Sequence, residues 1–160
     1  MVTERLVLRH FTLDDGAMIL ELLNDPAWIR FIGDRNARTL DDARGYLEKI
    51  RSSYERNGFG LYLVEARATR EPLGMCGIVK RDTLPEPDLG FAFLERHRGN
   101  GYALEAARAT LAHARAIGIE RLLAIAKEDN ERSARLLAKL GFVQESGETW
   151  SLNSRLAGAI

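Results

Sequence analysis

Two glycines that separate an apolar segment from a helical one form the part of the sequence best suited to chemistry. The stretch runs Arg98-Gly99-Asn100-Gly101-Tyr102-Ala103. Backbone N–H groups at the start of a helix lack intrahelical partners and together carry about half a positive charge. Because Gly99 and Gly101 have no Cβ, an anion can approach this backbone closely, and the small Ala103 keeps the first turn accessible. The pattern therefore predicts a phosphate-binding turn that uses main-chain donors.

The glycine pair has other interpretations, and the neighbouring residues exclude two of them. A dinucleotide-binding fingerprint, Gly-x-Gly-x-x-Gly, needs a third glycine where this chain has Leu104. A P-loop ends in Gly-Lys-Ser or Gly-Lys-Thr, and neither pair follows Gly101. A turn that only joins a strand to a helix remains as an alternative to the phosphate site.

Apolar runs predict the strands that surround this turn. The predicted strands cover residues 6–8, 61–65, 73–80, 88–94 and 121–127, with a last strand after Phe142. The run over 121–127 is apolar almost throughout, which is typical of a strand covered on both faces.

Helical spacing of apolar residues predicts four helices. Thr12 and Thr39 each precede an aspartate by three positions, which is the pattern of a capping box. The first helix is expected to end at Asn24-Asp25-Pro26. The other two helices cover 102–116 and about 130–140. The order β-α-α-β-β-β-α-β-α-β predicts an α+β (mixed α/β) fold in which the strand–helix–strand unit is parallel and right-handed.

Several ordered segments of the sequence resemble the GNAT superfamily of acyltransferases. Residues 98–103 are similar to its Q/R-x-x-G-x-G/A acyl-coenzyme A signature. The second block is Asn130-Glu131-Arg132-Ser133, followed by Lys139-Leu140-Gly141-Phe142. Two segments resemble the branch that contains the ribosomal-protein N-terminal acetyltransferases, namely Thr3-Glu4-Arg5-Leu6-Val7-Leu8-Arg9 and Pro72-Leu73-Gly74-Met75-Cys76-Gly77. The resemblance covers about residues 3–147.

This resemblance implies a single acyl-CoA N-acyltransferase domain over residues 1–160. The domain is expected to have a splayed, mostly antiparallel central sheet with flanking helices. The implied enzyme is an N-acetyltransferase that uses acetyl-CoA as co-substrate and no metal. It is expected to transfer the acetyl group to a primary amine by direct attack in a ternary complex, the acceptor being a protein N-terminal α-amine or a small-molecule amine. The alternative from another class is a non-catalytic acyl-CoA-binding module.

The resemblance also implies where the co-substrate binds. The pantetheine arm is expected to pair with backbone groups of Phe91 and Phe93, and the N–H of Phe93 or Leu94 to polarise the thioester carbonyl. The pyrophosphate is expected on the turn, where Arg98 adds its charge to the main-chain donors, and Asn130 is expected to contact the pantetheine amide. The residues expected to bind the co-substrate are Phe91, Phe93, Leu94, Arg98, Gly99, Asn100, Gly101, Tyr102, Ala103, Asn130 and Ser133.

Two residues are candidates for catalysis, and each has a structural alternative. Asp88 matches a position where related sequences often carry an acidic residue, and it is the candidate base; otherwise it is a carboxylate at a strand edge. Ser133 is the candidate hydroxyl for the thiolate; otherwise it is a first-turn residue of a capped helix. Many superfamily members have a tyrosine that acts as general acid and protonates the thiolate, and this chain has Leu137 at that position. His97 is expected to be an exposed residue of the turn without a role in binding or catalysis.

Composition narrows the partners and the compartment. The formal net charge is +0, so nothing favours nucleic acid or membrane binding. The single cysteine, Cys76, lies in an apolar run and is expected in the core rather than as a nucleophile. No secretory or membrane-spanning apolar run is found, which predicts a cytoplasmic location. Trp28, Phe31 and Tyr46 are candidates to line the acceptor pocket, with burial in the core as the alternative. The oligomeric state, monomer or homodimer, stays open.

Overall fold

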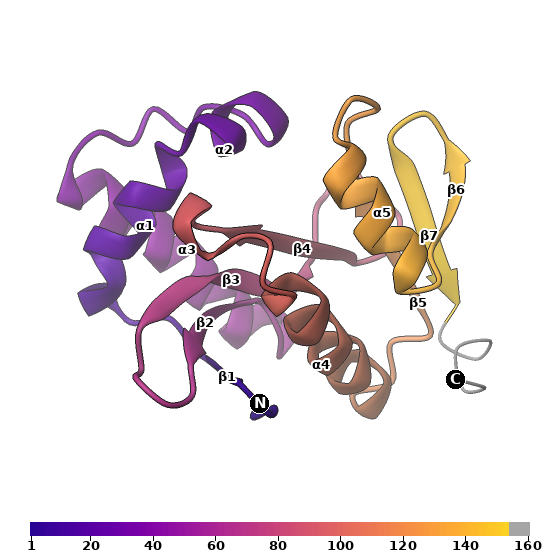
Figure 1. The fold of residues 1–160 in the computed structure, drawn as a ribbon, viewed down its shortest axis with the longest axis horizontal. Coiled ribbons are helices and arrows are strands. Elements are labelled where there is room, and N and C mark those ends of the chain that lie inside the picture. The colour runs from indigo at the N-terminus through magenta and orange to yellow at the C-terminus, as the bar shows by residue number, and fades with distance from the viewer. Residues whose placement is uncertain (154–160) are drawn as a thin grey trace.

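A seven-stranded sheet organises the protein in the computed structural model, which describes residues 1–153 (Figure 1). The strand order is β1-β2-β3-β4-β5-β7-β6, and all neighbours are antiparallel except β4 and β5, which are parallel. The strands are β1 (Leu6–Arg9), β2 (Leu61–Ala66), β3 (Pro72–Val79), β4 (Asp88–Phe93), β5 (Arg121–Ile125), β6 (Val143–Ser146) and β7 (Thr149–Asn153). The predicted mixed α/β fold with a mostly antiparallel sheet is confirmed.

The sheet is splayed where its two halves meet. β4 and β5 share one pair of Cα partners, Asp88 and Leu123, and a hydrogen bond from the Leu123 N–H to the Pro87 carbonyl at 2.9 Å. Beyond that point the two strands separate toward their C-terminal ends (Figure 1). The separation leaves the second half of β4 without a neighbour on the side of β5, as the family resemblance implies.

Helices cover both faces of the sheet. They are α1 (Gly16–Leu23), α2 (Pro26–Phe31), α3 (Leu40–Asn57), α4 (Tyr102–Ala116) and α5 (Glu131–Lys139). One core joins α1 and α3 to the sheet through residues such as Ile19, Leu47 and Met75. The other core joins α4 and α5 to the opposite face, where Leu111 and Leu137 are buried. The sheet therefore separates two apolar layers, and the gap between β4 and β5 lies within the sheet.

The helix boundaries follow the capping signals in the sequence. Thr12 and Thr39 both form capping boxes, although Thr12 opens a short 3-10 turn, Leu13–Asp15, that leads into α1. The predicted helix over 102–116 matches α4. Asn130 caps α5 by accepting the Ser133 N–H at 3.2 Å.

Two elements were missing from the sequence prediction. Pro26 does end α1, but it is also the first residue of α2, where the missing N–H of proline costs nothing and Asp25 supplies the cap. The last predicted strand is a hairpin, β6–β7, instead. All four residues of β6 are exposed, so the strand has no apolar alternation that would reveal it.

Candidate active site

The predicted phosphate-binding turn has the backbone conformation that its glycines allow. Gly99 and Gly101 have φ values of 79° and 80°, in the left-handed region that disfavours side chains with a Cβ. Gly101 is the N-cap of α4 and offers no side-chain cap, whereas α2, α3 and α5 all have one. The first α-helical bond of α4 runs from the Glu105 N–H to the Gly101 carbonyl at 3.1 Å. The preceding N–H groups are therefore available to an anion.

The edge of β4 continues from this turn as a row of backbone groups. The Leu94 N–H donates to the Leu73 carbonyl at 3.0 Å, which makes these two residues a hydrogen-bonded pair of the antiparallel ladder. Because such pairs alternate, Phe93 and Phe91, which face Gly74 and Cys76, direct their backbone groups away from β3 and into the splay. The prediction is corrected at Leu94, because its N–H serves the sheet and its side chain is 1% exposed.

The Arg98 side chain has a structural role that the sequence did not indicate. Its Nη2 lies 2.8 Å from Asp25 Oδ2, and its Nε donates to the Phe93 carbonyl at 2.9 Å. The side chain is 23% exposed and the Asp25 side chain 7% exposed. Burial raises the pKa of Asp25, but hydrogen bonds from Arg98 and from the Ala27 N–H lower it. Together the opposing effects outweigh burial, so the pKa lies below its ordinary value. The charge of Arg98 is thus already balanced by Asp25 rather than free for a phosphate.

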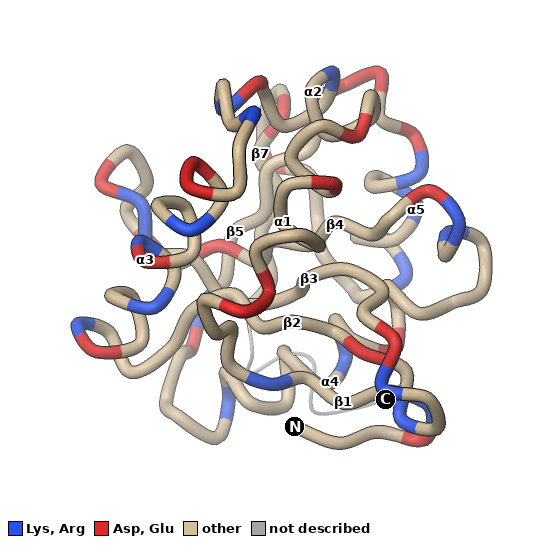
Figure 2. The backbone as a smooth tube through the Cα atoms, turned by 90° about the vertical axis from the view of Figure 1, so that its left-hand side faces the viewer, with Lys and Arg blue, Asp and Glu red and all other residues tan. Residues whose placement is uncertain are grey.

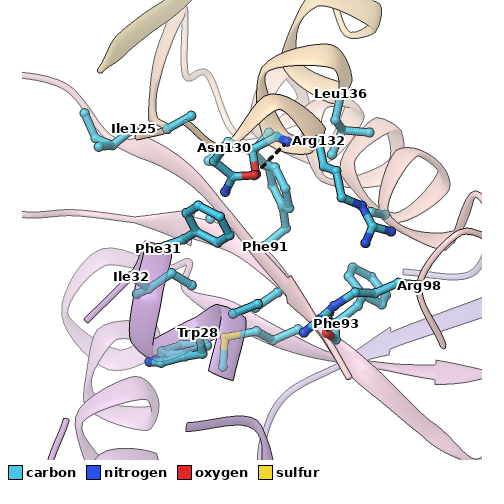
Figure 3. A pocket seen from close by; sticks show the side chains of 18 of the residues that line it. Trp28, Phe31, Ile32, Phe91, Phe93, Arg98, Ile125, Asn130, Arg132 and Leu136 are labelled. Carbon is cyan, nitrogen blue, oxygen red and sulfur yellow. Dashed lines mark hydrogen bonds between the residues drawn. The ribbon is translucent and has the colours of Figure 1, made fainter. Parts of the chain in front are cut away.

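A cleft of about 500 Å³ joins the turn, the edge of β4 and the two neighbouring helices (Figure 3). In this view Phe91 lies between Phe31 of α2 and Asn130 at the start of α5, and Phe93 lies beside Arg98. Trp28, Phe31 and Tyr46, the predicted lining residues, all border the cleft. Trp28 also belongs to the core, with 5% of its surface exposed. Trp28 therefore both lines the cleft and packs in the core.

The first turn of α5 brings the second sequence block to the same cleft. Asn130, Arg132 and Ser133 all line it. The Oδ1 of Asn130 is used by the Ser133 N–H, and its amide group lies beside the gap next to Phe91 (Figure 3). Leu137 is 1% exposed and packs in the core with Phe142, so this position offers no proton donor.

Asp88 is buried at the start of β4 and also borders the cleft. Its side chain is 2% exposed, and its Oδ1 accepts a hydrogen bond from Arg81 Nε at 2.9 Å. Burial raises the pKa of Asp88 above its ordinary value, and the nearby Arg81 only partly opposes this shift. A carboxylate with a raised pKa in a cleft is suited to proton transfer.

The lining of the cleft is basic although the chain is neutral overall. Asp88 is its only carboxylate among the described residues. The basic lining residues are Arg35, Arg81, Arg98, Lys127, Arg132, Arg135 and Lys139. Figure 2 shows acidic and basic residues interspersed along the chain as a whole, so the basic lining is a local feature. In residues 1–153, no three His, Cys, Asp or Glu side chains gather as metal ligands would.

Comparison with known proteins assigns the family. Residues 5–143 match the acetyltransferase (GNAT) domain. The chain belongs to the GNAT acetyltransferase family. This acetyltransferase is 33% identical to the uncharacterised protein YkkB of Bacillus subtilis over 148 residues, which are 88% of this chain and 83% of YkkB.

Solved structures of GNAT proteins share the fold. An acetyltransferase from Agrobacterium tumefaciens str. C58 is 25% identical, with a TM-score of 0.80 over 94% of this chain and 91% of that one. The ribosomal L7/L12 α-N-protein acetyltransferase RimL, in complex with coenzyme A, is 16% identical, with a TM-score of 0.81 over 96% of each chain. The second likeness concerns the fold alone. No helix within residues 1–153 of this acetyltransferase has the length and apolar character needed to cross a membrane.

Two other residues of this acetyltransferase have environments that bear on chemistry. Cys76 is fully buried, and burial raises the pKa of its thiol to about 12, so the thiolate is not accessible at neutral pH. The prediction of a core cysteine is confirmed. His97 differs from its prediction as an exposed residue of the turn, since its side chain is 13% exposed and its Nε2 lies 3.2 Å from Glu71 Oε1.

Arg5 contacts the phosphate-binding turn, although it does not line the cleft and the site prediction did not include it. Its Nη1 donates to the Asn100 carbonyl at 2.9 Å, and its Nε lies 2.7 Å from Glu105 Oε2. Its guanidinium also lies 4.7 Å from the centre of the Tyr102 ring. Arg5 thus ties the start of the chain to the middle of the phosphate-binding turn and to the first turn of α4. A residue almost a hundred positions away gives no local signal of such a contact.

Proposed function

We propose that this protein transfers the acetyl group of acetyl-CoA to a primary amine by direct attack in a ternary complex. The observation that supports this best is the uncapped start of α4, which opens beside the free edge of β4 in one basic cleft. The coenzyme A complex of RimL, which has the same fold, is consistent with this choice of co-substrate. The acceptor is a peptide N-terminus or a small-molecule amine.

The main-chain groups of the cleft fit the two ends of coenzyme A. The N–H groups of residues 99–103 would hold the diphosphate, because the left-handed glycines leave room beside them. The Arg98 N–H already donates to the Glu95 carbonyl at 3.2 Å. The backbone edge at Phe93 and Phe91 would pair with the pantetheine arm as an added strand does. The Asn130 amide group would contact the arm from α5.

The residues beyond the pantetheine edge would carry out the chemistry. The N–H of Phe93 or Phe91 would polarise the thioester carbonyl, since Leu94 is excluded as a donor. Asp88 would accept the proton that the amine loses, directly or through a water. The hydroxyl of Ser133 would donate a hydrogen bond to the departing sulfur. An α-amine of pKa near 8 is neutral in about a tenth of molecules at pH 7, which makes it an easier acceptor than lysine.

Residues 1–160 would form one domain, of which 154–160 lie outside the described residues. The protein would act in the cytoplasm, as a monomer or a homodimer.

The direct test is release of free thiol from acetyl-CoA by the purified protein across a panel of amines. Release above the uncatalysed rate with at least one amine supports the proposal. Tight binding of acetyl-CoA with no release for any amine would instead support the non-catalytic binding module.

A further inference from the structure

A cluster of polar side chains lines the cleft on the face of the sheet opposite α4. Side chains alternate along β4, so Asp88 lies on the same face as Ala92, which packs against the core of α1 and α3. Tyr46 of α3, Arg35 of the loop before α3 and Arg81 after β3 border the cleft with it. Burial raises the pKa of Tyr46, and the charges of Arg35 and Arg81 oppose this shift only in part. We call Arg35, Tyr46, Arg81 and Asp88 the basic cluster.

The hydrogen-bonding capacity of the basic cluster is only partly used. Arg81 donates its Nε to Asp88, which leaves its two Nη groups. Arg35 forms no ion pair with any residue in 1–153, and the Tyr46 hydroxyl forms no hydrogen bond within the same range. The cluster thus holds two guanidiniums, one phenol and one carboxylate, and all four side chains belong to residues that line the cleft. Such a set is complementary to an anion.

We propose that the acceptor amine carries a carboxylate group, which is bound by Arg35, Arg81 and the hydroxyl of Tyr46. This inference rests on the proposed function and restricts the class of acceptor amine. The excess positive charge favours the neutral, nucleophilic form of a bound amine. It also disfavours polycations such as polyamines, whereas a carboxylate on the acceptor compensates for the repulsion.

The other residues of the cleft indicate what kind of structure joins the amine and the carboxylate of the acceptor. Phe31, Ile32 and Ile125 border the cleft near its mouth, and the two isoleucines are 41% and 42% exposed. An apolar side group or an alkyl spacer would cover them. The carboxylate can belong to a free amino acid or to an acidic residue near a peptide N-terminus.

Matched acceptor pairs that differ in the carboxylate test the inference. The pairs are phenylalanine and phenylalaninamide, 6-aminohexanoate and hexylamine, and peptides beginning Met-Asp or Met-Asn, with spermidine as the polycation. We expect the carboxylate member of at least one pair to have at least tenfold higher kcat/KM, and spermidine to be poor. A free carboxylate raises the pKa of an α-amine, so in the first pair this preference runs against intrinsic reactivity. The pair in which the carboxylate member is preferred shows whether the acceptor is a free amino acid or a peptide.

The Arg35→Ala variant tests whether the basic cluster causes the preference. We expect a rise of at least tenfold in KM for the carboxylate acceptor, little change for its uncharged partner, and an unchanged KM for acetyl-CoA. Arg51→Ala, an exposed position on α3 away from the cleft, is the matched control and should behave as wild type. Equal use of both members of every pair, or a preference for spermidine, overturns the carboxylate proposal while acetyl transfer stands. Absence of thiol release with every amine would instead count against the proposed function.

Discussion

Asp25 Oδ2 and Arg98 Nη2 lie 2.8 Å apart and connect the start of α2 to the loop that precedes α4. The other Asp25 oxygen accepts the Ala27 N–H at 2.9 Å and caps α2. Arg98 in turn holds the Phe93 carbonyl at 2.9 Å. One continuous set of hydrogen bonds therefore fixes the acceptor wall, the edge of β4 and the phosphate-binding turn relative to one another.

Substitutions at Asp25 should separate its cap from its ion pair. Asp25→Asn keeps a capping oxygen but loses the charge, and we expect it to lower the free energy of unfolding by about 1–2 kcal/mol. Asp25→Ala loses both contacts and should cost about 2–4 kcal/mol. Urea unfolding of the two variants measures the difference, and equal stabilities would contradict a role for Asp25 as a cap.

The same carboxylate makes part of the stability depend on pH. Since the pKa of Asp25 is lowered in the folded state, its contribution is complete above the ordinary aspartate pKa and is lost as pH falls through the folded value. We therefore expect the stabilities of wild type and Asp25→Ala to converge in acid. A constant difference from pH 7 down to pH 2 would argue against this ion pair.

Asp88→Asn should remove the proton acceptor while preserving the shape of the side chain. We expect kcat to fall by about a hundredfold or more, with the affinity for acetyl-CoA unchanged. In wild type, kcat/KM should decline as pH falls through the raised pKa of Asp88, and the variant should lack this limb. An unaltered pH profile in Asp88→Asn would assign the base elsewhere.

Cys76→Ala should retain turnover. The thiol is fully buried against Thr110, and its pKa of about 12 leaves no accessible thiolate for an acyl-enzyme. The variant should lose only modest stability, because a small cavity replaces the sulfur. A folded variant without activity, as judged by circular dichroism and thiol release, would contradict direct transfer.

Local patterns in the sequence were sufficient for the phosphate-binding turn and for most helices and strands, but not for α2 or for the β6–β7 hairpin. The capping residues Thr39 and Asn130, the helix over 102–116 and the glycine pair all act through neighbours a few positions away. The splayed, mostly antiparallel sheet and the open edge of β4 were expected from the family resemblance, because periodicity does not determine which strands pair.

Long-range contacts were the part that the sequence did not reveal. Arg98 was expected at a phosphate, but its partner Asp25 is distant in the chain and becomes visible only after folding. The same holds for the contact of Arg5 with Asn100 and for the presence of Tyr46 and Arg81 in one cleft. Each depends on which side chains meet across the sheet, and pattern analysis carries no such information.

Binding of acetyl-CoA to Gly101→Val, compared with Gly118→Val, tests the phosphate-binding turn most directly. Both glycines have left-handed φ values, 80° and 83°, so both variants should have a similar backbone strain, and a Cβ at Gly101 also meets Arg5 Nη2 at 3.3 Å, at the end of a flexible side chain. A Cβ at Gly118 meets nothing within 4 Å, and this residue follows the far end of α4, outside the cleft. By titration calorimetry we expect Gly101→Val to weaken binding by about a hundredfold or more and Gly118→Val to bind as wild type. Equal affinities of the two folded variants would contradict a diphosphate held by the backbone of residues 98–103.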